Sequence, residues 1–279
     1  MPFVCRTYLV PTAAEDDVVA ELWRLGTLGV SVEPVSADEI RLRAYFSSPP
    51  SESASLPSDV RLEAEGLFAD RDWLELFRHQ AAPFPLGDRF LVDPGEPRAG
   101  NLPSAPGRRL LQLPARAAFG TGSHESTALA VEVLETIPVS GARVLDVGTG
   151  TGVLALAALA LGAQSAVAFD LDLASPFHAR DNARRNGLSL ALFAGTLAAI
   201  GPSRFDLALA NLIAEQLLPE LEALLGLVRP SGAVILSGIL VERSAMLLEE
   251  ARRLGFMVVG QCRRGEWVAL YLAEEGHAA

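Results

Sequence analysis

The stretch Arg143-Val144-Leu145-Asp146-Val147-Gly148-Thr149-Gly150-Thr151-Gly152 combines a short apolar strand pattern with a glycine-rich turn. Residues 153–160 follow as an apolar helix pattern, whose first N–H groups would point back at the turn. Glycines at alternate positions let the backbone turn sharply and approach a ligand closely, because no Cβ intervenes. About twenty residues later, Val167-Ala168-Phe169-Asp170 predicts a strand that ends in a carboxylate. This unit is typical of the adenosine-binding half of a doubly wound α/β sheet.

The rest of the C-terminal half extends this α/β pattern. Strand and helix patterns alternate and then end in a hairpin around Arg263-Arg264-Gly265-Glu266. The alternation predicts a mostly parallel sheet with an antiparallel C-terminal edge. The expected strands are 190–193, 205–212, 233–238, 256–262 and 267–272, and the expected helices are 173–186, 213–228 and 242–254.

The N-terminal part has patterns of its own. Strands are expected near 3–10, 29–32, 40–46 and 60–64, and an amphipathic helix at 14–25, which together make a small α/β unit. Residues 70–79, with Asp70 as a candidate N-cap, predict a further helix. Farther on, strands are expected at 89–92 and 109–113.

Composition narrows the classes of function. The net charge is −11 and the chain contains no lysine, which excludes any mechanism that needs a catalytic lysine. An acidic chain is poorly suited to nucleic-acid backbones and better suited to a basic protein or a cationic small molecule. The four histidines form no metal-ligand grouping, so no metal is expected. The chain shows neither a membrane-spanning apolar run nor a signal-peptide pattern at its start, and we expect a cytoplasmic protein.

The spacing of the glycines bears on the ligand. A dinucleotide fingerprint places its third glycine where this chain has Val153, and a P-loop requires a lysine. The pattern Asp-x-Gly-x-Gly-x-Gly instead resembles motif I of the S-adenosylmethionine-dependent methyltransferases. In that reading the backbone of Gly148, Gly150 and Gly152 passes under the cofactor, and Asp170 accepts hydrogen bonds from the ribose hydroxyls. Asp146 then acts through the loop and orients either the turn or the amino-acid end of the cofactor.

A second glycine-rich loop, Ala117-Ala118-Phe119-Gly120-Thr121-Gly122-Ser123-His124-Glu125-Ser126-Thr127, leads into an apolar helix. Such a helix start offers free N–H donors to a ligand, although an ordinary capped loop has the same pattern. Asn211 stands at the carboxyl end of the buried strand 205–212. It is a candidate to accept an N–H bond from an amine nucleophile. Phe119 could face a sulfonium, and His124 is a candidate general base.

Several motifs in order resemble one family. "AAFGTGSHEST", "VLDVGTGTGVLALAALALGA", "DNARRNG", "ANLIAEQL", "LSGIL" and "GEWV" together are similar to the ribosomal-protein methyltransferase family PrmA, and "DWLELF" is similar to its linker helix. The resemblance implies a seven-stranded Rossmann-like class I methyltransferase domain at 83–279. It also implies a linker helix at 70–82 and a small ferredoxin-like substrate-recognition domain at 1–69.

The resemblance also implies roles for individual residues. Thr127, Gly148, Asp170 and Asn211 match cofactor-contact positions, and Phe119, Gly120 and Thr121 match the loop over the methionine end. The implied cofactor is S-adenosylmethionine. The implied partner is ribosomal protein eleven of the large subunit, methylated on its α-amine and lysines by a monomeric enzyme.

The chain departs from the family where it has Leu113-Pro114-Ala115-Arg116 in place of Glu-Pro-Gly-Met. This departure keeps two alternatives open. The first is another protein-lysine or small-molecule N-methyltransferase on the same scaffold. The second is a non-catalytic cofactor-binding protein.

Overall fold

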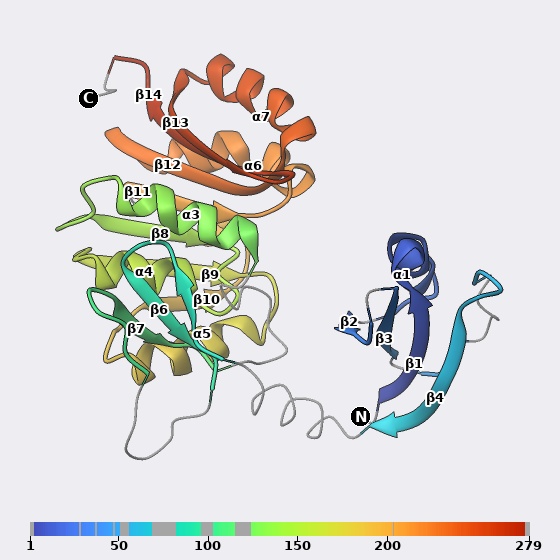
Figure 1. The fold of residues 1–279 in the computed structure, drawn as a ribbon. Helices are drawn as coiled ribbons and strands as arrows, with labels where there is room; N and C mark the ends of the chain where they lie inside the picture. The colour runs from blue at the N-terminus through green and yellow to red at the C-terminus, as the bar shows by residue number, and fades with distance from the viewer. Residues whose placement is uncertain are drawn as a thin grey trace. The chain divides into compact units, whose positions relative to one another are not determined.

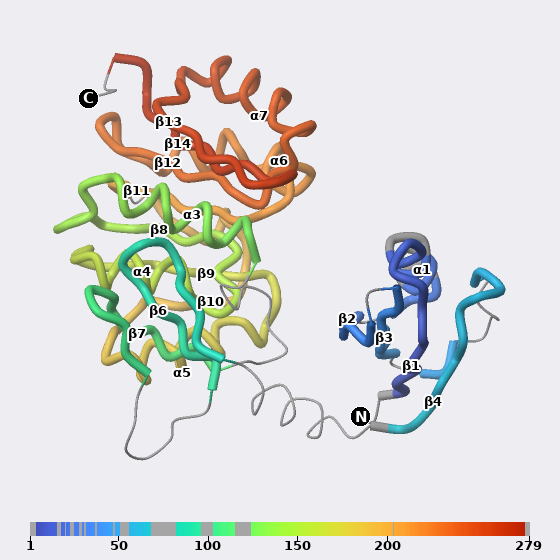
Figure 2. Tube along the Cα trace, in the orientation of Figure 1, coloured from blue at the N-terminus to red at the C-terminus, as the bar shows by residue number. Residues whose placement is uncertain are grey.

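The computed structural model describes residues 3–27, 29–36, 38–46, 48–50, 56–68, 82–95, 103–114, 124–202 and 204–276. The chain divides into two compact units, Met1–Phe77 and Arg78–Ala279, and Figure 2 traces both along the chain. The linker helix predicted at 70–82 lies outside the described residues, apart from Ala82. The expected domain boundaries therefore stay predictions.

The first unit is a four-stranded antiparallel sheet with one described α-helix, α1 (Glu15–Arg24), which a short 3-10 helix (Thr12–Ala14) precedes. The strand order is β2-β3-β1-β4, the order of a ferredoxin-like sheet. Buried and partly exposed residues alternate strictly along β3, so one face of the sheet forms the core with Val18 and Leu22 of α1. The strands are β1 (Phe3–Pro11), β2 (Gly29–Pro34), β3 (Glu39–Phe46) and β4 (Arg61–Phe68).

The second unit is built on the seven-stranded sheet that the sequence predicts, with the order β10-β9-β8-β11-β12-β14-β13 (Figure 1). Neighbouring strands from β10 to β12 are parallel, and β14 runs antiparallel to both β12 and β13. The strands are β8 (Arg143–Val147), β9 (Ser165–Asp170), β10 (Ala191–Ala194), β11 (Phe205–Asn211), β12 (Val228–Leu240), β13 (Phe256–Arg264) and β14 (Trp267–Glu274). The mixed sheet with an antiparallel edge is confirmed.

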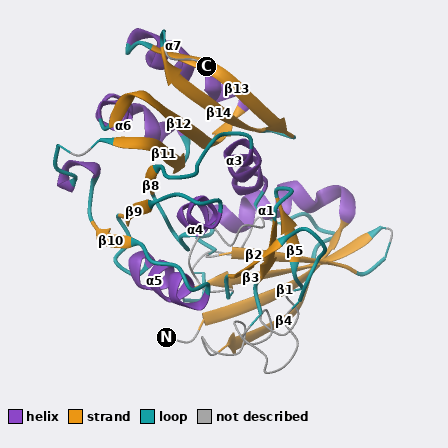
Figure 3. Cartoon of the chain, turned by 90° about the vertical axis from the view of Figure 1, so that its left-hand side faces the viewer, coloured by secondary structure: helices purple, strands orange, loops and turns teal. Residues whose placement is uncertain are grey.

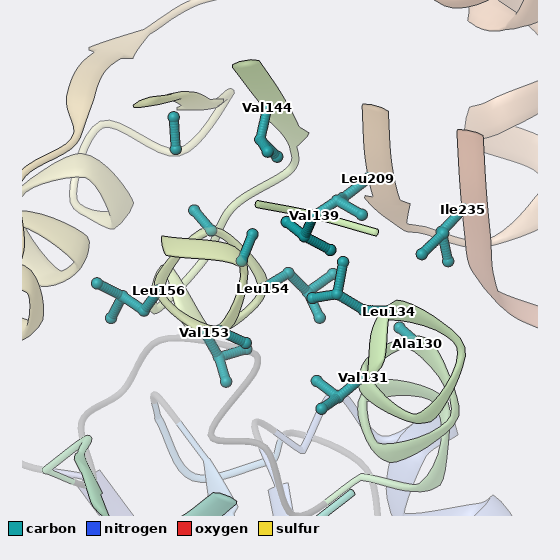
Figure 4. Packing of buried hydrophobic residues seen from close by; sticks show 14 of the residues in the cluster. Ala130, Val131, Leu134, Val139, Val144, Val153, Leu154, Leu156, Leu209 and Ile235 are labelled. Atoms are coloured by element: carbon teal, nitrogen blue, oxygen red, sulfur yellow. The ribbon is translucent and has the colours of Figure 1, made fainter. Parts of the chain in front are cut away.

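Helices cover both faces of this sheet (Figure 3). On one face α3 and α4 pack against side chains such as Val144, Leu209 and Ile235 (Figure 4). On the other face α6 and α7 pack against the alternating set that includes Leu145 and Leu236. The central strands are apolar on both sides for this reason. The helices are α3 (Glu125–Glu135), α4 (Val153–Ala160), α5 (Ser175–Arg185), α6 (Ala214–Gly226) and α7 (Val241–Arg253). Among the described residues, no helix is both long and apolar enough to cross a membrane.

A small three-stranded sheet packs outside α3 and α4. Its strands are β5 (Phe84–Leu86), β6 (Phe90–Asp93) and β7 (Arg109–Gln112), of which the sequence analysis missed β5. The carboxylate of Glu135 in α3 accepts bonds from the N–H groups of Asp88 and Arg89, which fixes the β5–β6 turn. Arg109 donates to the carbonyl of Ala160 at the end of α4. The small sheet is therefore hydrogen-bonded to α3 and α4, whose N-termini lie at the candidate site.

Candidate functional site

The glycine loop lies where β8 ends and α4 begins, and its backbone needs glycine. Gly148, Gly150 and Gly152 have φ angles of +69°, +52° and +84°, in the left-handed region that other residues rarely adopt. A Cβ at Gly148 would lie 2.6 Å from Leu212 Cδ2, and one at Gly152 would lie 3.0 Å from the Cβ of Ala179. Glycine here serves both the turn and the close packing of the elements around it.

Asp146 holds this loop in place from below. Its side chain is buried, and one carboxylate oxygen accepts from Thr149 Oγ1 at 2.7 Å and from the Ala155 N–H at 3.2 Å. Burial raises the pKa of the Asp146 carboxyl to about 6, and the two hydrogen bonds oppose the rise. Of the two roles that the sequence left open, these contacts are those of a residue that orients the turn.

Asp170 ends β9 beside the same loop. Its Oδ2 accepts from the Gly150 N–H at 2.8 Å, and its Oδ1 accepts from the Asp172 N–H at 3.0 Å. A carboxylate accepts several hydrogen bonds at once, so both oxygens keep further acceptor capacity. The side chain is partly exposed and lines a cavity.

Asn211 and the first turn of α3 line the same cavity. Asn211 Nδ2 donates to Thr127 Oγ1 at 3.0 Å, and Thr127 is fully buried. The Oδ1 atom of Asn211 is shielded from solvent and accepts no hydrogen bond from the residues that the structure describes. An unpartnered buried acceptor is costly to the fold and requires an explanation.

His124 is the N-cap of α3. Its Nδ1 accepts from the Ser126 N–H at 3.2 Å and lies 2.8 Å from Ser126 Oγ. The ring meets Trp267 edge to face, with centroids 4.8 Å apart. These contacts give His124 a capping and packing role.

One cavity of about 870 Å³ joins these features, a size suited to a small-molecule ligand. It brings together the six predicted residues His124, Asp146, Gly148, Gly150, Asp170 and Asn211. Thr127 and Gly152 lie behind the wall, Thr127 as the partner of Asn211. Phe119, Gly120 and Thr121 lie outside the described residues.

Some lining residues were not predicted. They are mainly apolar or uncharged and include Leu171, Thr196, Leu197, Ile213, Gln216 and Trp267. Thr196 and Leu197 follow β10, where the carboxyl ends of parallel strands meet, and this position is a signal that sequence reasoning could have used. Within the described ranges, no group of histidine, cysteine, aspartate or glutamate could hold a metal ion.

The family model and the relatives described below agree on the family to which the chain is similar. The family described as "Ribosomal protein L11 methyltransferase (PrmA)" matches residues 47–275. A protein of that name from Geobacter sulfurreducens is 40% identical over 211 residues, which cover 75% of this chain and 69% of the relative. One from Symbiobacterium thermophilum is 35% identical over 205 residues, which cover 72% of this chain and 65% of the relative. The chain therefore spans about two thirds of the length of these relatives.

A solved structure adds the fold. The crystal structure of ribosomal protein L11 methylase from Lactobacillus delbrueckii subsp. bulgaricus superimposes with a TM-score of 0.64 and 31% sequence identity. The match covers 70% of this chain and 99% of the other. Over the matched part, the chain thus shares its fold with a solved relative.

Proposed function

Because the chain belongs to the PrmA family of ribosomal protein L11 methyltransferases, we propose that it transfers methyl groups from S-adenosylmethionine to amino groups of ribosomal protein L11. The α-amine and lysine side chains are the proposed acceptors. The observation that carries the proposal is the meeting of the glycine loop, the Asp170 carboxylate and the Asn211 amide around one cavity.

The residues present fit this cofactor. Gly148 and Gly150 offer a wall of bare backbone where a Cβ at Gly148 would collide with Leu212. Asp170 supplies an acceptor carboxylate for a ribose diol, and Phe169, Leu171 and Leu197 supply apolar surface for a purine. When bound, S-adenosylmethionine supplies a methyl group already activated on a sulfonium centre. No lysine or metal is required from the protein.

The protein's task is then to bind, orient and desolvate the reactants. An amine attacks only when neutral, whereas a lysine amine has an ordinary pKa near ~10.4 and an α-amine near ~8. Asn211 lines the cavity, and its Oδ1 accepts no hydrogen bond from the described residues. In the proposed reaction this oxygen accepts one N–H of the amine and directs its lone pair. Bound S-adenosylmethionine would supply the methyl group to the amine nitrogen and leave as S-adenosylhomocysteine, and the proton lost by the amine would pass to solvent.

The negative charge of the chain and of the cavity lining supports a basic partner. The chain carries a net charge of −11, and Asp172 and Glu220 line the cavity. Charge complementarity of this kind speeds encounter with a cationic protein and favours its ammonium groups at the cavity.

The direct test is methyl transfer by the purified full chain. Labelled S-adenosylmethionine is mixed with purified L11 and, in parallel, with L11 whose amines have been acetylated. We expect label in the first sample and none in the second, and mass spectrometry then locates the methyl groups. Tight binding of S-adenosylhomocysteine without label in L11 would refute the proposed substrate. It would favour an amine carried by another protein or small molecule.

A further inference from the structure

Strand β12 changes its path where it passes the candidate site. Its pairing with β14 shifts register between Leu236 and Ile239. Between these residues Gly238 has φ of +76° and lines the cavity. Such a bulge redirects the strand and is common next to functional sites.

Two hydrogen bonds join this bulge to α3 and to the end of β11, and a third joins those two elements to each other. Ser237 is fully buried, and its Oγ donates to the carbonyl of Ser126 in the first turn of α3 at 2.7 Å. Its carbonyl accepts from the Leu212 N–H at 3.0 Å. The third bond runs from Asn211 to Thr127, the residues next to Leu212 and Ser126. The bonds form a closed ring through α3, β11 and β12.

Gly238 also packs directly on the strand end that carries Asn211. A Cβ at this position would lie 2.8 Å from Asn211 Oδ1 and 2.9 Å from the N and O atoms of Leu212. Real Cβ atoms essentially never come so close to backbone. The bare Gly238 backbone therefore allows the close packing of β12 on the Asn211 amide and the Leu212 backbone.

We propose that Ser237 and Gly238 are positioning residues for methyl transfer, which act by holding the Asn211 amide and the Leu212 backbone at the cavity wall. The proposal rests on the proposed function for the identity of the reaction. The ring of hydrogen bonds ties the amide to α3 and β12, and the Gly238 backbone restrains it by close packing.

The test compares two alanine substitutions that impose the same backbone strain. Gly255 has φ of +84° in the same unit, but no atom lies within 4 Å of a Cβ placed there. Gly238→Ala should lower kcat about 100-fold, since a displacement near 1 Å can cost this much. Gly255→Ala should leave kcat unchanged. Neither variant should weaken S-adenosylhomocysteine binding by more than about threefold, since neither substitution removes the Asp170 carboxylate or a glycine of the loop.

A double-mutant cycle separates positioning from general damage. If Gly238 acts through Asn211, adding Gly238→Ala to Asn211→Ala should cause no further loss of kcat. Ser237→Ala should lower kcat about tenfold in the wild-type background and have no effect beside Asn211→Ala. Full multiplication of the losses, or equal kcat values for the Gly238 and Gly255 variants, would overturn the proposal.

A spectroscopic measurement works without any substrate. The side-chain NH₂ resonances of Asn211 are identified by their absence from the spectrum of Asn211→Ala. They should move in Gly238→Ala and stay in place in Gly255→Ala. If the wild-type chain does not methylate L11 but the resonances respond in this way, the proposed substrate is wrong while the placement of Asn211 by Gly238 holds. Unmoved resonances in Gly238→Ala would defeat the positioning role.

Discussion

Asn211 at the end of β11 donates a hydrogen bond over 3.0 Å to Thr127 in the first turn of α3, a residue 84 positions earlier in the chain. The bond engages the amide nitrogen, whereas the Oδ1 atom accepts no hydrogen bond from the residues that the structure describes. A single polar contact between two distant segments thus creates the acceptor that the proposed reaction uses. It also explains why a fully buried threonine stands at a helix start.

Asn211→Ala should lower kcat for L11 methylation about 100-fold, because the loss of an oriented hydrogen-bond acceptor removes the positioning of the amine. Steady-state kinetics and calorimetric binding of S-adenosylhomocysteine give the measurement. Cofactor affinity should change by less than about threefold, since Asp170 and the glycine loop remain. Unchanged kcat would remove Asn211 from the mechanism.

Thr127→Val is the companion change. It keeps the shape of the buried side chain and removes the acceptor of the Asn211 Nδ2–H bond. We expect a loss of kcat of about tenfold, since the amide stays present but is free to rotate. A loss as large as that of Asn211→Ala would indicate that Thr127 itself contacts a reactant.

Asp170→Asn should weaken S-adenosylmethionine binding about 10- to 100-fold, because hydrogen bonds to a charged group contribute about 1.5–3 kcal/mol. Isothermal titration calorimetry at one salt concentration is the measurement. Asp206→Asn is the control, because Asp206 lies near the other end of β11, where it accepts from the Arg143 N–H and pairs with Arg229. Equal affinity in both variants would show that the Asp170 charge does not hold the cofactor.

Stability should depend on pH through Asp146. Its pKa is raised from 3.8 to about 6 in the folded protein, so between these pH values the folded state holds a proton that the unfolded chain has released. The contribution of the protonated Asp146 carboxyl to stability is therefore fully present below about pH 4. It is lost as the pH rises through 6, which lowers the free energy of unfolding by about 3 kcal/mol. Denaturant unfolding of wild type and Asp146→Asn from pH 4 to pH 7 measures this. Parallel curves for the two proteins would contradict the assignment.

Gly152→Ala should destabilise the second unit by about 2–4 kcal/mol, from the left-handed backbone and the 3.0 Å approach to Ala179. Gly187→Ala should cost about 1 kcal/mol, because its φ of +65° carries the same backbone penalty with no atom within 4 Å of the new Cβ. Thermal unfolding of both variants provides the comparison. Similar losses would mean that the loop accommodates the methyl group.

Local patterns predicted most of the elements. The apolar strands and the helical periodicity of the second unit correspond to β8–β14 and α3–α7, with boundaries that differ by a few residues. Strand β12 is the largest difference, because it begins at Val228 and continues past Gly238, the expected end, to Leu240. A glycine in a strand pattern suggests the end of the strand. Gly238 instead lies in a bulge, and the pairing with β14 continues on both sides of it. The short strand β5 was missed because three residues carry too little periodicity.

The sequence by itself determined that a glycine turn, a strand-end carboxylate and a strand-end amide exist, since each has a local signature in residue type and spacing. Only the tertiary structure decided how these groups are used. The Asp146 carboxylate accepts a hydrogen bond from Thr149 in the loop, and His124 caps α3. Thr127 is buried and accepts a hydrogen bond from Asn211, which lies 84 positions away in the chain. The role of Gly238 is of the same kind, since its neighbour Asn211 comes from another strand.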